Sequence, residues 1–148
     1  MVREQSTSGY QLQFERHENF LAATVTGENN AQNVLAYMQD IVEECRREEC
    51  FRVLIHECLE GPRLDSFEVF SIASEGAMQA HGVFSAVAYV DEGMGDMADF
   101  VETVAVNRGF PIKTFATVAD AERWLRRQTG AADEKNLFEE HNSRNPYR

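Results

Sequence analysis

The chain has few basic residues, no long apolar run and few cysteines, and each shortage argues against a class of protein. Its 148 residues include 14 Lys and Arg against 25 Asp and Glu, a net charge of −11. Nucleic acids and anionic membranes are bound by clustered Lys and Arg, so both are disfavoured as partners. No apolar run approaches the roughly 20 residues that span a bilayer, and the N-terminal MVREQSTSGY lacks the apolar segment of a signal peptide. We therefore expect a cytoplasmic protein without a membrane span.

The cysteine and glycine patterns argue against two kinds of cofactor site. Cys45, Cys50 and Cys58 are odd in number, cannot all pair internally, and fit a reducing compartment in which they act as small hydrophobes. Their spacings of five and eight residues match no standard zinc pattern, so we expect no metal. Gly93 and Gly95 are not followed by the third glycine of a dinucleotide-binding loop, so we expect no cofactor.

The apolar residues that are present predict one layered α/β domain. Alternation of apolar and polar residues over 10–16, followed by the Ala-, Val- and Thr-rich run 20–26, predicts an antiparallel hairpin. Apolar stripes of helical period, alternating with short apolar runs, predict the remaining elements. Helices are expected at 31–49, 66–80, from about 94 to 107 and from 118 to before 130, with strands at 52–57, 84–90 and 111–115.

This order, ββαβαβαβα, implies right-handed crossovers and a mixed sheet with the helices packed on it. We assign residues 10–128 to the domain, 1–9 to an N-terminal extension and 129–148 to a polar C-terminal tail. The apolar residues Leu137 and Phe138 would allow that tail to dock on a neighbouring subunit. A homo-oligomer is therefore one of the alternatives that the sequence allows.

The segment after the strand at 52–57 is the first candidate site. The carboxyl ends of parallel strands face a crevice, and here a Gly-Pro loop leads into a helix that opens on Asp65 and Ser66. Asp65 as N-cap and Glu68 three residues later form a capping-box pattern, which by itself explains both residues. Alternatively, the hydroxyl of Ser66 lies beside the positive end of the helix dipole, which favours an added phosphate.

A second candidate site lies beside the same crevice. Met94 and Met97 would form a flexible apolar lip there, although core packing explains Met97 equally well. Strand alternation puts His56 on the face opposite Glu57, and no third group is evident that would orient His56 as a base. We therefore predict no catalytic residues and no enzymatic activity.

At the level of element order and of two segments, the chain resembles the STAS superfamily, in particular its SpoIIAA-like group, also described as STAS/SEC14-domain proteins. The segments are RVLIHE followed by a loop of LEGP type, and DFVETVAVNRGFPIKTFATVADAERWL. The resemblance implies a SpoIIAA-like STAS fold and a regulatory or binding module rather than an enzyme.

The anti-sigma-factor antagonists of that superfamily carry a phosphorylated serine in an Asp-Ser-Ser-Gly-Leu type motif. The matching positions here keep Asp65 and Ser66, and replace the small continuation by Phe67 and Glu68. The resemblance thus implies a protein partner bound through these four residues. Its SEC14 side implies an apolar, lipid-like ligand in a pocket lined by His56, Phe84, Met94 and Met97. A hydrolase or transferase using Asp65 and His56 is the last of the three hypotheses.

Overall fold

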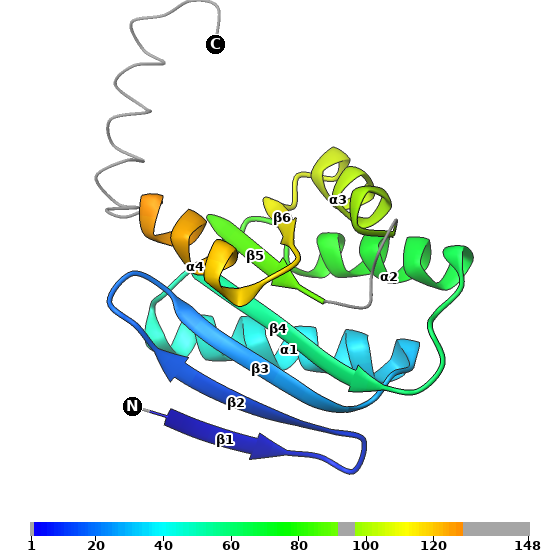
Figure 1. The fold of residues 1–148 in the computed structure, drawn as a ribbon, viewed down its shortest axis with the longest axis horizontal. Helices are drawn as coiled ribbons and strands as arrows, with labels where there is room; N and C mark the ends of the chain where they lie inside the picture. Colours follow the sequence, from blue (N-terminus) through cyan, green and yellow to red (C-terminus); the bar gives the residue numbers. More distant parts are fainter. Residues whose placement is uncertain (1, 92–96, 129–148) are drawn as a thin grey trace, which may run out of the picture.

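Six strands form one mixed sheet in the computed structural model, which describes residues 2–91 and 97–128 (Figure 1). The strands lie side by side in chain order. They are β1 (Val2–Ser6), β2 (Tyr10–Arg16), β3 (Leu21–Glu28), β4 (Arg52–Glu60), β5 (Ala86–Val90) and β6 (Ile112–Phe115). β2 is antiparallel to both of its neighbours, β1 and β3, and β3 to β6 are parallel. The predicted α/β class, hairpin and parallel strands are confirmed.

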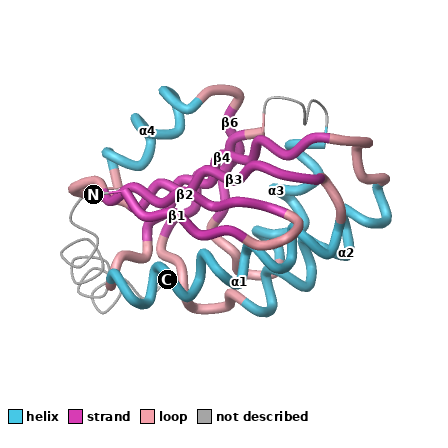
Figure 2. Tube along the Cα trace, turned by 90° about the horizontal axis from the view of Figure 1, so that it is seen from below, coloured by secondary structure: helices cyan, strands magenta, loops and turns pink. Residues whose placement is uncertain are grey.

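The helices of the described residues cover the two faces of the sheet unequally (Figure 2). One face carries α1 (Ala31–Glu48), α2 (Ser66–Gln79) and α3 (Met97–Asn107), and α4 (Val118–Arg127) packs alone on the other. Each of the first three connects two adjacent parallel strands. Because such crossovers are right-handed and the strand order always advances in the same direction, all three fall on the same face.

The core accordingly has two layers, and β4 contributes to both. Val53 and Ile55 face α1–α3, whereas Leu54 packs with Ala121 and Leu125 of α4. All three side chains are buried, which explains why the sequence here is continuously apolar rather than alternating. The predicted burial of cysteine as a small hydrophobe is confirmed for Cys45 and Cys50.

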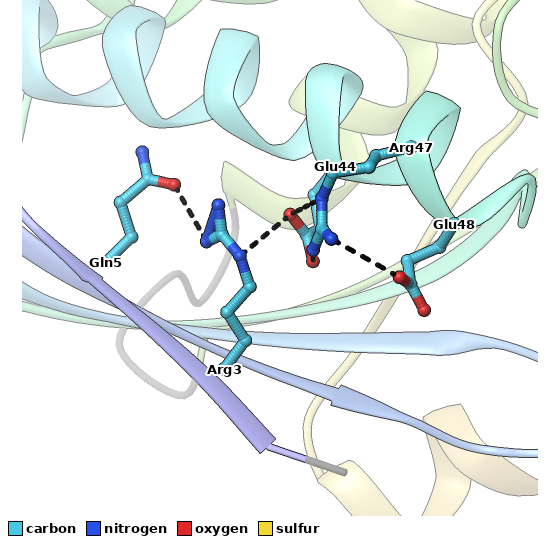
Figure 3. A network of polar contacts seen from close by, with 5 residues as sticks. All are labelled: Arg3, Gln5, Glu44, Arg47 and Glu48. Carbon is cyan, nitrogen blue, oxygen red and sulfur yellow. Dashed lines mark hydrogen bonds and ion pairs between the residues drawn. The ribbon is translucent and has the colours of Figure 1, made fainter.

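The edge strand β1 was not predicted. It pairs antiparallel with β2, so residues assigned to an extension of the domain add a strand to its sheet. Figure 3 shows how β1 contacts α1: Arg3 Nε lies 3.6 Å from Oε1 of Glu44, which also binds Arg47. Glu44 is only 4% exposed, so these two arginines compensate a buried charge. The predicted tail at 129–148, with its proposed oligomer contact, lies outside the described residues.

Candidate functional site

A cavity of about 220 Å³ lies between the sheet and helices α1–α3. Small residues on the inner face of α2 help to leave this space, because Ala73, Gly76 and Ala77 fill less volume than the residues that usually pack between a helix and a sheet. Most of the lining is apolar. The apolar part of the lining comprises Val34, Met38, Leu64, Val69, Ile72, Ala73, Gly76, Ala77, Met97, Val101, Ala105, Phe110 and Ile112.

Glu57 is the central polar residue of the cavity lining. It points from β4 toward α1, is 8% exposed, and accepts hydrogen bonds on Oε2 from the hydroxyls of both Tyr37 and Tyr89. Tyr37 comes from α1 and is fully buried, and Tyr89 comes from the neighbouring strand β5. A carboxyl group in a core needs such donors, because an unpaired buried charge is strongly destabilising.

Two further charged residues line the cavity at the carboxyl ends of the parallel strands. Arg63 follows β4 and Asp91 follows β5, and Arg63 Nη2 donates to Asp91 Oδ2 over 2.9 Å. The side chain of Arg63 is 50% exposed and that of Asp91 only 8%. The pair therefore lies where the cavity meets solvent.

The protonation of these groups follows from their surroundings. Burial raises the pKa of Glu57 above its ordinary value of 4.5, while the two tyrosine hydrogen bonds lower it; Asp91 raises it further and Arg63 lowers it. Burial also raises the pKa of Tyr37 and Tyr89 well above 10, and the nearby negative charge of Glu57 adds to the effect. Both hydroxyls therefore stay protonated and remain donors.

The four residues of the first candidate site lie at the start of α2, outside the cavity lining. The predicted capping box is confirmed: Asp65 Oδ1 accepts from the backbone N–H of Glu68 over 2.8 Å, and Glu68 Oε1 accepts from that of Asp65 over 3.1 Å. Ser66 is exposed beside this cap. Phe67 is 78% exposed, an unusual position for a large apolar side chain on a small domain.

The second candidate site is rearranged by the structure. Met97 lines the cavity, and Met94 lies outside the described residues. His56 pairs in register with Val90, whose side chain packs in the α4 layer, so His56 points to the face of the sheet away from the cavity. Phe84 packs edge-to-face against Phe110, with ring centroids 5.6 Å apart, and is not part of the lining. Glu57, not His56, is therefore the β4 residue at the cavity.

The polar lining residues that sequence reasoning missed are Asn29, Tyr37, Glu57, Arg63, Tyr89 and Asp91. One signal was present. The alternation of side chains along the strand places Glu57 on the same face as Val53 and Ile55, which is the face toward the core. An acidic residue that faces the core needs hydrogen-bonding partners.

The described residues do not form the catalytic pair or a metal site. The His56 side chain points to the α4 face of the sheet, whereas Asp65 caps α2 on the other face, so the pair of the hydrolase hypothesis is not brought together. Within residues 2–91 and 97–128 no three His, Cys, Asp or Glu side chains are grouped so as to hold a metal ion. In the same part of the chain, no helix combines the length and apolar character needed to cross a membrane.

Comparison with known proteins supports the fold. No protein-family model and no curated protein matches the chain. Among solved structures, the crystal structure of an anti-sigma factor antagonist from Mycobacterium paratuberculosis is similar, with a TM-score of 0.52 and 17% sequence identity over 82% of this chain and 97% of that chain. The NMR structure of the protein TM1081 has a TM-score of 0.47 and 14% identity over 77% of this chain and 87% of that chain. The first likeness confirms the predicted SpoIIAA-like STAS fold.

Proposed function

We propose that this protein is a non-catalytic binding module that holds one small, mostly apolar molecule in the cavity beneath α2. The observation that carries the proposal is the cavity itself: apolar side chains from three helices and the sheet surround a space with a few converging polar groups, the usual composition of a ligand site. The described lining residues include no His, Cys, Ser or Lys. Their carboxyl and phenol groups are hydrogen-bonded to one another or to Arg63.

The size of the cavity limits the ligand. A cavity of roughly 150 Å³ lined by aliphatic and aromatic side chains takes up benzene. By proportion, the 220 Å³ found here suits a compact molecule of about nine non-hydrogen atoms. This is a small metabolite or a short aliphatic chain, and not a whole membrane lipid.

Native mass spectrometry of protein purified without denaturant tests this function. We expect a non-covalent extra mass on the wild type that is lost in Ala73→Leu, whose larger side chain fills part of the cavity. The matched control is Ala119→Leu, the same change at an exposed position of α4 on the other face of the sheet, and it should retain the mass.

If nothing copurifies, the same three proteins are titrated with 1-octanol, octylamine and octanoate. We expect at least one of these compounds to bind the wild type, with an affinity that Ala73→Leu lowers and Ala119→Leu leaves unchanged. The proposal is wrong if no compound behaves in this way.

A second candidate function is supported by the exposed side of α2. Phe67 and Met78 are 78% and 74% exposed, and their spacing of eleven residues brings them to the same side of the helix after about three turns. Such exposed apolar side chains are typical of a protein-binding surface. The similar solved structure is named an anti-sigma factor antagonist, which adds support for a regulatory protein that binds a protein partner around Asp65–Glu68.

This second function has its own test. Phe67→Arg should abolish capture of a partner that the wild type retains, and Phe51→Arg, which changes a half-exposed Phe before β4, should not. If Ser66 regulates the contact, the protein from its own host carries a phosphate that Ser66→Ala removes. An unchanged set of partners in Phe67→Arg contradicts this function. The odd number of cysteines supports a cytoplasmic site of action.

A further inference from the structure

We propose that the cavity selects ligands whose polar end is a hydrogen-bond donor, a hydroxyl or an amine, and rejects those that end in a carboxylate. This inference rests on the proposed small-molecule function and deepens it by naming the ligand class. It also distinguishes this cavity from one built for fatty acids. A cavity with only apolar walls would bind a fatty acid as well as the matching alcohol or amine.

The first reason is that the hydroxyl donors at the cavity are already used. A tyrosine hydroxyl has one proton, and those of Tyr37 and Tyr89 both go to Oε2 of Glu57. The other carboxylate oxygen, Oε1, takes neither of these bonds. An ionised carboxylate offers about four acceptor positions, so Glu57 can still accept from a ligand, whereas its two partners have no further proton to give.

The second reason is the balance of charge. Arg63 is the one cation among the described lining residues, and it faces two carboxyl groups, those of Glu57 and Asp91. With Glu57 ionised, the polar groups therefore sum to a net charge of −1. A carboxylate head would add a second uncompensated negative charge inside a partly buried site, while an ammonium head would neutralise the first.

Two donor groups of the lining could contradict the inference: Arg63, and the amide of Asn29, which gives one of its two N–H donors to the Pro62 carbonyl over 3.0 Å. A guanidinium has five N–H donors, and its bond to Asp91 uses only some of them. Half of the Arg63 side chain is nevertheless exposed, so its remaining donors are already hydrated, and a ligand carboxylate would gain little by replacing that water. Experiment can separate the two possibilities because Arg63 and Glu57 act on opposite ligand classes.

Three compounds with the same eight-carbon chain provide the test. 1-Octanol and octylamine have about nine non-hydrogen atoms each and octanoate has about ten, close to the size that the cavity suits. They are titrated calorimetrically into wild type, Glu57→Gln and Arg63→Gln at about pH 8, well above the ordinary pKa of a carboxyl group. We expect the alcohol and the amine to bind about tenfold or more tightly than octanoate. Glu57→Gln should weaken octylamine by about tenfold and reduce its preference over octanoate.

The outcomes separate the inference from the function on which it rests. Binding of octanoate as tightly as the other two, or its loss in Arg63→Gln, overturns the inference and leaves the ligand-binding function intact. Failure of all three compounds to bind overturns the proposed function. If Glu57→Gln does not fold, as shown by circular dichroism, the ranking of the three compounds on the wild type and on Arg63→Gln still decides the inference.

Discussion

Removing the hydroxyl of Tyr37 tests whether the buried hydrogen bonds at Glu57 are as strong as the structure implies. Tyr37→Phe leaves the ring in place, in the core and edge-to-face against Tyr10, and removes only the donor to Glu57 Oε2. Because the acceptor is a carboxyl group that is 8% exposed, water cannot easily replace the lost donor.

The expected magnitude follows from the chemistry of the bond. Hydrogen bonds to charged groups contribute about 1.5–3 kcal/mol to the free energy of unfolding, and we expect the lower half of that range because Tyr89 still donates to the same oxygen. For a domain of this size, 1 kcal/mol corresponds to about 2–4 °C in Tm. Tyr37→Phe should therefore lower Tm by about 3–9 °C.

Tyr10→Phe is the matched control. The hydroxyl of Tyr10 also donates to a carboxylate, that of Asp40, but Asp40 is more accessible to water, so we expect a cost of only about 0.5–1.5 kcal/mol. Urea unfolding of both variants gives the comparison. If Tyr37→Phe is no more destabilised than Tyr10→Phe, the reasoning about the buried carboxyl is wrong. In the double variant with Tyr89→Phe, the two losses should be coupled by about 0.5 kcal/mol or more, since both donors share one oxygen.

Three further predictions concern backbone fit and pH. Gly27→Ala should destabilise the protein by about 1–3 kcal/mol in urea unfolding, because φ is +135° and the added Cβ would lie 2.5 Å from the backbone oxygen of Gly9. Gly76→Ala should stabilise it by about 0.5–1 kcal/mol in the same assay, since a Cβ there meets nothing within 4 Å and glycine weakens a helix interior; a loss of stability would contradict this. The raised pKa of Glu57 contributes stability that is fully present below its unfolded value near 4.5 and is lost as pH rises through its folded value. Subtracting the pH–stability curve of Glu57→Gln from that of the wild type should reveal a downward step above pH 4.5, and a flat or rising difference would refute it.

The fold was largely predictable because local signals agree with it. Asp65 and Glu68 mark the start of α2 at the right residue, since the hydrogen bonds of a capping box are made within one turn. The alternation in β2 fixes which face is buried. β1 carries no such signal: four of its five residues are exposed, and what holds it is backbone pairing with β2 and the contact of Arg3 with Glu44.

The site was less predictable because its parts come together only in the folded chain. Tyr37 and Tyr89 lie 20 and 32 residues from Glu57 in the sequence. The choice between His56 and Glu57 shows the same limit. Alternation places them on opposite faces, but the apolar run before them is buried on both faces and does not show which one carries α1–α3.

Helix α2 links the two proposed functions physically. Its inner side, with Ala73, Gly76 and Ala77, lines the cavity, while Phe67 and Met78 are exposed on the same 14-residue helix. A ligand that packs against the inner side stabilises those positions of α2 that fit the ligand. It can change the affinity for a partner only if the ligand binds one position of α2 more tightly than another. If a partner is captured through Phe67, saturating the cavity should therefore change its affinity, and Ala73→Leu should remove that dependence while leaving capture itself in place. An affinity that is identical with and without ligand would mean that the two sides of α2 act independently.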